Sequence, residues 1–215
     1  MQRVRSRAAP RQAHAGMALV LAATLAGGCG KQQPAAQAQA PAPAYAPQLQ
    51  HLLDEKLRLL AALARETVIQ EAVNAANSAG ASLSTADILA RDRQWQRAGA
   101  DDAFTRALQE NAAARRLAAF CEAHLAFPEV FVTDRRGLVV AMSNRTSDYL
   151  QADEDWWQRA YAQGRGHAHA GEIEYDESAH SQAIALCLPV PATTGSQIAG
   201  VIKAVFDVKA VKAEL

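Results

Sequence analysis

The stretch Val130-Phe-Val-Thr-Asp-Arg-Arg-Gly-Leu-Val-Val-Ala-Met-Ser143 decides the fold class. Residues 130–133 and 138–143 are rich in β-branched and large apolar side chains, which favour strands. Between them, Asp134-Arg-Arg-Gly137 is typical of a turn with glycine at the position that needs a positive φ. The stretch therefore predicts a β-hairpin.

The part of the chain before this hairpin has a helical pattern. Apolar side chains recur at helical spacing over residues 48–79, which predicts one long amphipathic helix. Ser84, with Asp87 three residues later, predicts the N-cap of a shorter helix. A third helix should span about residues 101–125, beginning at one of two adjacent aspartates.

After the hairpin the pattern returns to one helix and then to strands. Residues 153–163 should be helical, and residues 172–175 and 182–190 should form a second pair of strands. Residues 198–207 should form a last strand that leads into a terminal helix. Segregated helices and antiparallel strands predict an α+β domain.

Several short segments of this region carry a family resemblance when they are taken in order. They are Phe127-Pro-Glu-Val-Phe-Val-Thr-Asp134, Arg136-Gly137, Thr146-Ser-Asp-Tyr149, Asp153-Glu154 with Trp157, Leu188-Pro-Val190 and Gly200-Val201. From about Gln48 to the C-terminus, the chain resembles a single-module Cache domain, which is a PAS-like extracellular sensor. The resemblance implies a five-stranded antiparallel sheet with the long helix on one face. It also implies a ligand pocket on the other face, beneath the segment that joins the second and third strands, and ligand recognition without catalysis.

The segment Asn144-Arg-Thr-Ser-Asp-Tyr-Leu-Gln-Ala-Asp-Glu-Asp-Trp-Trp157 joins those two strands and is rich in aromatic and acidic side chains. Such a mixture commonly lines small-molecule pockets. Adjacent tryptophans on a helix point about 100° apart, so we expect only one of them to face a ligand. The resemblance favours Trp157, which leaves Trp156 to pack against the sheet. The full set of expected ligand contacts is Tyr149, Trp157, Lys203, Asp148, Asp153, Glu154 and Tyr175.

Lys203 lies in the middle of the last predicted strand, among apolar residues. Strand alternation places it on the same face as Val201 and Val205. A buried ammonium is costly unless it is paired. We therefore expect Lys203 to extend to the rim of the sheet, or to pair in the pocket with an anionic ligand or with one of the carboxylates Asp148, Asp153 and Glu154.

A second group of polar residues surrounds the next strand. His167 and His169 precede the acidic residues Glu172, Glu174 and Asp176, and His180 follows them. Two histidines in His-x-His spacing suit Zn²⁺ or Cu²⁺, but the set fits no closed structural-zinc motif. A solvated loop and edge strand is the favoured interpretation, with a metal site as the alternative.

The N-terminus has the pattern of a bacterial export signal. An arginine-rich start precedes a short apolar core at residues 17–26, too short for a bilayer-spanning helix. Leu25-Ala-Gly-Gly-Cys29 resembles a lipobox, although the leucine lies one residue further from the cysteine than usual. We expect a signal peptide at residues 1–28, lipidation at Cys29 and a Gln/Ala/Pro-rich tether at residues 29–47, with the alternative of an ordinary cleavage site.

The domain itself is expected at residues 48–215, with a helical part at 48–125 and the sheet at 128–215. Gly30, where an aspartate would indicate retention in the inner membrane, suggests the periplasmic side of the outer membrane. Cys121 and Cys187 could form a disulfide or remain separate buried thiols, and the sequence leaves both alternatives open.

Composition excludes several functions. The whole chain has 22 basic and 22 acidic residues, and removal of the arginine-rich start leaves it mildly acidic. The sequence therefore has no basic patch that would indicate nucleic-acid binding. No Gly-x-Ser-x-Gly, phosphate loop or nucleophile–histidine–acid set indicates an enzyme, and no cofactor is expected.

We therefore expect a lipid-anchored periplasmic sensor of a small polar or charged molecule that signals through a separate partner, such as a sensor kinase or cyclase. One alternative is a metal-binding lipoprotein. The other is an interaction module with a vestigial pocket, in which the long leucine-rich helix forms a homodimer or docks on a receptor kinase.

Overall fold

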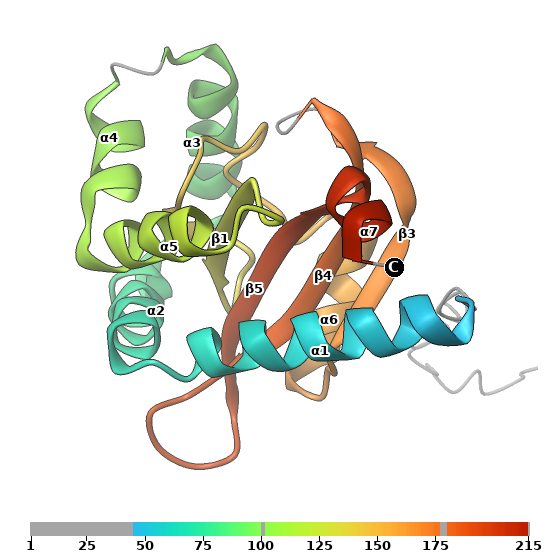
Figure 1. Cartoon of the computed structure of the whole chain (residues 1–215). Helices are drawn as coiled ribbons and strands as arrows, with labels where there is room; N and C mark the ends of the chain where they lie inside the picture. The colour runs from blue at the N-terminus through green and yellow to red at the C-terminus, as the bar shows by residue number, and fades with distance from the viewer. Residues whose placement is uncertain (1–44, 100–101, 177–179, 215) are drawn as a thin grey trace, which may run out of the picture. The chain divides into compact units, whose positions relative to one another are not determined.

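A computed structural model describes residues 45–99, 102–176 and 180–214 (Figure 1). The helices in this part of the chain are α1 (Pro47–Ala64), α2 (Thr67–Ala79), α3 (Thr85–Arg97), α4 (Ala103–Glu110), α5 (Ala112–Ala123), α6 (Asp155–Tyr161) and α7 (Val208–Glu214). The strands are β1 (Glu129–Asp134), β2 (Val139–Met142), β3 (His169–Asp176), β4 (Ser181–Pro191) and β5 (Ile198–Asp207).

The strands form one antiparallel sheet in the order β2-β1-β5-β4-β3. The last strand in sequence, β5, is therefore central, because it inserts between the two hairpins. This arrangement confirms the predicted α+β class and the five-stranded antiparallel sheet. The hairpin turn at Gly137 also has the expected positive φ, 77°.

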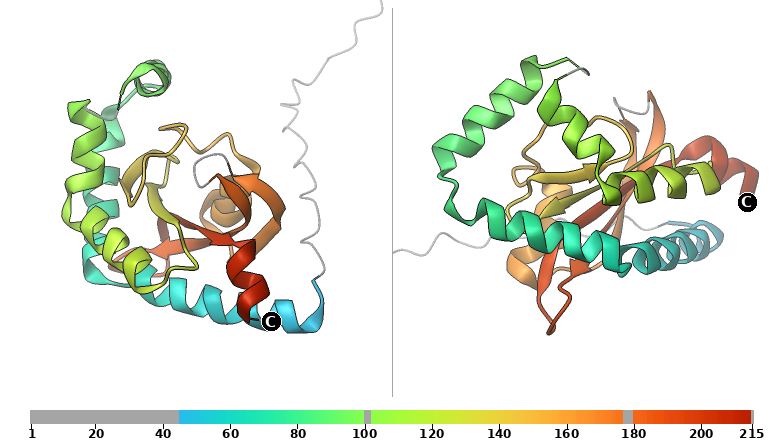
Figure 2. Two further views of the ribbon diagram at one scale, coloured as in Figure 1. Left: turned by 45° about the horizontal axis from the view of Figure 1, so that its top comes forward. Right: turned by 90° about the vertical axis from the view of Figure 1, so that its left-hand side faces the viewer.

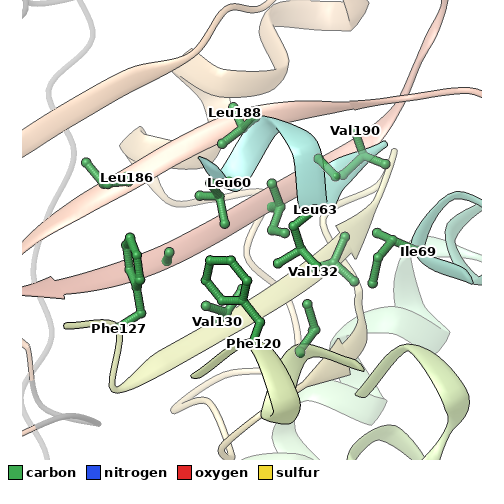
Figure 3. Close-up of a cluster of buried hydrophobic side chains, with 14 of the residues drawn as sticks. Leu60, Leu63, Ile69, Phe120, Phe127, Val130, Val132, Leu186, Leu188 and Val190 are labelled. Atoms are coloured by element: carbon green, nitrogen blue, oxygen red, sulfur yellow. The ribbon is translucent and has the colours of Figure 1, made fainter. Parts of the chain in front are cut away.

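One face of the sheet is covered by α1, α2 and α5, which form the main core together with the strand residues that point toward them (Figure 2). Figure 3 shows Leu60 and Leu63 of α1 pointing toward strand residues such as Val132 and Leu188. These side chains are almost completely buried, and burial of each contributes about 1.5–3 kcal/mol.

The prediction of one helix over residues 48–79 was wrong, because α1 ends at Ala64 and α2 begins at Thr67. Glu66 between them is extended, with φ −64° and ψ 136°. Its carboxylate forms a bidentate ion pair with Arg116 of α5, with Nη2 to Oε1 at 2.6 Å and Nε to Oε2 at 2.7 Å. The break lets α1 lie along β4 while α2 packs on β1.

The predicted third helix is also divided in two, at Asn111. This residue ends α4 in an extended conformation, and its side-chain oxygen accepts a hydrogen bond from the amide of Ala114 at 2.9 Å. It therefore caps α5. The start of α4 is as expected, because Asp102 accepts hydrogen bonds from Phe104 and Thr105.

Two further helix predictions had different outcomes. Ser84 and Asp87 form the predicted capping box at the start of α3. In contrast, α6 is shorter than the expected 153–163, because Ala162 and Gln163 have positive φ values of 40° and 57° and end the α-helical turn in a short 3₁₀ segment.

Cys121 and Cys187 are separate free thiols, which decides between the two alternatives. Complete burial raises the pKa of Cys187 to about 12, so this thiol stays protonated. In the part of the chain that the structure describes, no helix combines the length and apolarity needed to cross a bilayer. The expected signal peptide, Cys29 and most of the tether lie outside the described residues.

Candidate ligand-binding site

A cavity of about 520 Å³ lies on the sheet face opposite α1, between the start of α6 and the hairpin β3–β4. Figure 1 shows α6 behind the sheet and α1 in front of it. The cavity is lined by Asp153, Glu154, Asp155, Trp156, Arg159, His169, Gly171, Glu172, Glu174, Tyr175, Asp176, Ala183, Ala185 and Lys203.

Small side chains on β4 leave room for this cavity. Residues 183–188 read Ala-Ile-Ala-Leu-Cys-Leu, and strand alternation separates the small residues from the large ones. Ile184, Leu186 and Leu188 pack into the main core beneath α1, whereas Ala183 and Ala185 line the cavity. The alternation of small and large side chains is thus a sequence signal for the cavity floor.

Lys203 lies on the cavity face of the central strand, which is one of the two positions that the sequence left open. Its ammonium is 4.0 Å from Asp176 Oδ2 and lies over the Trp156 ring, 5.0 Å from the ring centroid. The Phe131 centroid, whose ring packs edge to face on Trp156, is 5.7 Å from the ammonium. Its protein carboxylate partner is therefore Asp176, which was not among the expected partners Asp148, Asp153 and Glu154.

The two tryptophans have exchanged their expected places. Trp157 is buried, stacks on Tyr161 and donates its indole N–H to Thr133 Oγ1 at 2.9 Å. This contact fastens α6 to the sheet, and Trp157 does not line the cavity described here. Trp156 does line it and presents its ring to Lys203. The member of the pair that faces the cavity is therefore Trp156 and not the expected Trp157.

Tyr149 and Asp148 lie away from this cavity, against α3. Tyr149 is buried, its ring contacts those of Trp95 and Phe104, and burial raises the pKa of its phenol. Asp148 accepts a hydrogen bond from Gln96 at 2.8 Å. These contacts attach the segment before α6 to the outer helices.

Asp92 strengthens the same attachment. Its Oδ1 accepts two backbone hydrogen bonds, each 3.0 Å long, from the amides of Tyr149 and Leu150. The indole N–H of Trp95 donates to the Thr146 carbonyl at 3.0 Å. The segment joining β2 to α6 is thus held at several points by α3, which fixes the approach to the cavity.

The walls of the cavity are acidic. Burial raises the pKa of Glu154, the neighbouring Asp153 carboxylate raises it further, and the Lys203 ammonium opposes the shift. Glu172, Glu174 and Asp176 form the opposite wall on β3. The aromatic segment and the His/Glu group, which the sequence suggested as separate sites, therefore border one cavity.

His169 is the most buried polar residue of the lining, at 6% exposed. Burial lowers its pKa from 6.5 to about 4, so the ring is neutral at pH 7. Its Nδ1 has no hydrogen-bond partner among the described residues. Buried ring nitrogens are normally hydrogen-bonded, so this atom is available to a ligand or to water.

The lowered pKa of His169 predicts a loss of stability in acid. Between pH 6.5 and about 4, the unfolded chain binds a proton at this position that the folded chain does not, so stability falls as the pH falls. Over this pH range, the free energy of unfolding of His169→Gln should fall by up to about 3 kcal/mol less than that of the wild type. Urea unfolding at a series of pH values measures it, with His51→Gln on the exposed side of α1 as the control. Parallel pH curves for the wild type and His169→Gln would contradict the assignment.

Of the expected ligand contacts, the cavity brings together Asp153, Glu154, Tyr175 and Lys203. The residues that the expected ligand contacts did not include are Asp155, Trp156, Arg159, His169 and the β3 carboxylates, among others. Metal binding gains no support, because within the described ranges no three or more His, Cys, Asp or Glu residues are grouped as metal ligands. His167 and His180 are exposed.

No protein-family model matches the chain, and no curated protein matches it. Among solved structures, the chain is similar to the extracellular domain of the putative histidine kinase vpHK1S-Z8, at 9% identity and a TM-score of 0.44 over 77% of this chain and 54% of that chain. It is also similar to the ligand-binding domain of the Pseudomonas aeruginosa PAO1 amino acid chemoreceptor PctB in complex with L-Arg. This match has 17% identity and a TM-score of 0.42 over 77% of this chain and 54% of that chain.

The V. cholerae histidine kinase DctB sensor domain is a third match, at 20% identity and a TM-score of 0.37, over 78% of this chain and 60% of that chain. The chain thus spans little more than half the length of the first two structures. It is structurally similar to sensor and ligand-binding domains of chemoreceptors and histidine kinases. The fold described above rests on the sheet order and not on these matches.

Proposed function

We propose that this chain is a periplasmic sensor or binding protein of the Cache type that recognises a small polar molecule and catalyses no reaction. The observation that carries the proposal is the cavity of about 520 Å³ beside the paired Lys203. Its volume falls within the range of small-ligand sites, and its lining combines an aromatic face with charged groups that can orient a ligand.

The lipid anchor and the signalling route are part of the same proposal. Cys29 would carry the lipid, and the domain would act through a separate partner such as a sensor kinase or cyclase. The support for the anchor is the sequence Leu25-Ala-Gly-Gly-Cys29 after a short apolar core.

Dimerisation or docking through the apolar face of the long helix is less favoured. The buried leucines of α1 are already packed in the main core, so a partner could reach them only if α1 left the sheet. The outward side of α1 carries polar residues such as His51, Glu55 and Arg58.

A thermal-shift screen of the full chain against amines, amino acids and organic acids tests the proposal. At least one compound should raise the melting temperature, and Trp156→Ala should weaken its binding at least about tenfold, as expected for loss of an aromatic contact in a binding site. The control is Leu125→Ala, which removes a side chain that is 87% exposed and lies outside the cavity. The proposal fails if no compound binds, or if both variants bind the hit as the wild type does.

A further inference from the structure

The cavity has an excess of negative charge. Its lining includes six carboxylates, three at the start of α6 and three on β3, against two cations, Arg159 and Lys203. The carboxylates repel one another, which is one reason that the pKa of Glu154 is raised. A ligand that brings positive charge would relieve this repulsion, whereas an anionic ligand would add to it.

Lys203 occupies the most favourable position for a single cation. Its ammonium contacts the Trp156 and Phe131 rings, which pack edge to face on each other, and lies beside Asp176. A ligand cation cannot share that position without repulsion from the lysine. The remaining sites for positive charge are the carboxylates at the start of α6 and those further along β3, which belong to two separate elements of the lining.

His169 provides an independent sign of a ligand that donates hydrogen bonds. Its side chain is more than nine-tenths buried and lines the cavity, and its Nδ1 is unpartnered within the part of the chain that the structure describes. A neutral imidazole has one ring nitrogen that accepts a hydrogen bond, and an ammonium group can donate to it.

The carboxylates are spread along two walls instead of converging on one point. Over the described ranges, His, Cys, Asp and Glu residues form no group of three that could hold a metal ion. A compact metal cation needs convergent oxygen ligands. An elongated cation with separated charges fits dispersed carboxylates better.

We infer that the ligand of this cavity is a linear diamine or polyamine, whose ammonium groups pair with carboxylates at the start of α6 and on β3, with His169 as a further acceptor. This inference rests on the proposed function and names its ligand class. Lys203 then acts as a specificity determinant, because its own cation lies beside Asp176 and occupies the cation position next to the Trp156 and Phe131 rings.

Calorimetric titration of the full chain with four probes tests the inference. 1,4-Diaminobutane should bind about tenfold more tightly than n-butylamine, the effect of one additional charge-assisted hydrogen bond. Succinate, which has the same chain length but two negative charges, should not bind. Mg²⁺ should bind more weakly than 1,4-diaminobutane. Equal affinity for Mg²⁺, or preference for succinate, would overturn the inference.

Variants on the two walls localise the binding. Glu154→Gln and Glu174→Gln should each weaken 1,4-diaminobutane about tenfold. Glu71→Gln, at an exposed position of α2 on the other side of the sheet, should leave its affinity unchanged. If all three variants weaken binding equally, the diamine responds only to net charge, and the inference fails.

Lys203→Gln distinguishes failure of the inference from failure of the proposed function. A diamine should bind the variant at least as tightly as the wild type, because a repelling cation is removed and Asp176 loses its lysine partner. If the hit of the screen is instead an anion whose affinity Lys203→Gln lowers, a ligand site exists but the inference about its class is wrong. If nothing binds either protein, both are wrong.

Discussion

Trp95→Ala should lower the free energy of unfolding by about 3–5 kcal/mol, the usual cost of truncating a buried tryptophan. The Trp95 side chain is only 1% exposed, and its ring contacts those of Phe104 and Tyr149. The substitution also removes the hydrogen bond to the Thr146 carbonyl and the ring beneath the Arg145 guanidinium. Urea unfolding measures the effect.

Trp95→Phe separates the contribution of aromatic packing from that of the hydrogen bond to Thr146. It keeps an aromatic ring in the cluster but leaves the buried Thr146 carbonyl without its donor, which should cost about 1–3 kcal/mol. A loss below about 1 kcal/mol in Trp95→Ala would show that α3 does not hold the segment before α6 in the way described here.

Gly200→Ala should destabilise the domain by more than about 4 kcal/mol, which is at the severe end of single substitutions. A Cβ at this position would lie 1.9 Å from the backbone oxygen of Thr133 and 3.0 Å from Val73 Cγ1. Gly200 pairs with Asp134 across the two central strands, so relief of the clash requires β1 and β5 to separate. The backbone atom cannot move aside as a flexible side chain would.

The matched control is Gly99→Ala, where a Cβ would meet nothing within 4 Å. Thermal unfolding followed by circular dichroism compares the two variants. Gly200→Ala should be largely unfolded at room temperature or fail to accumulate, whereas Gly99→Ala should match the wild type. A wild-type melting temperature for Gly200→Ala would contradict the close contact between β1 and β5.

Local sequence patterns predicted most of the secondary structure. They failed where a helix is interrupted but the apolar spacing continues through the interruption. Leu63 and Ile69 both face the sheet, so the apolar spacing continues through the interruption at Glu66. Asn111 likewise caps a new helix in a stretch rich in alanine, which gives no sign of an interruption. Where a cap has a distinct signature, as at Ser84, the prediction was confirmed.

The site was harder to predict because its parts are brought together only by the sheet. Lys203 was found from the cost of burying its charge, but Asp176 reaches it from β3, on the far side of β4. The choice between Trp156 and Trp157 depends on how α6 is rotated, and the hydrogen bond to Thr133 fixes that rotation. Neither the Lys203–Asp176 pair nor the rotation of α6 can be read from residue spacing along the sequence.

Hydrogen–deuterium exchange of the full chain, with and without the strongest hit of the thermal-shift screen, shows where the ligand binds. We expect slower exchange in residues 153–159 and 169–176, which border the cavity, and unchanged exchange in α3. Protection confined to α3, where a separate open hollow is lined by Arg93 and Arg97, would contradict this expectation.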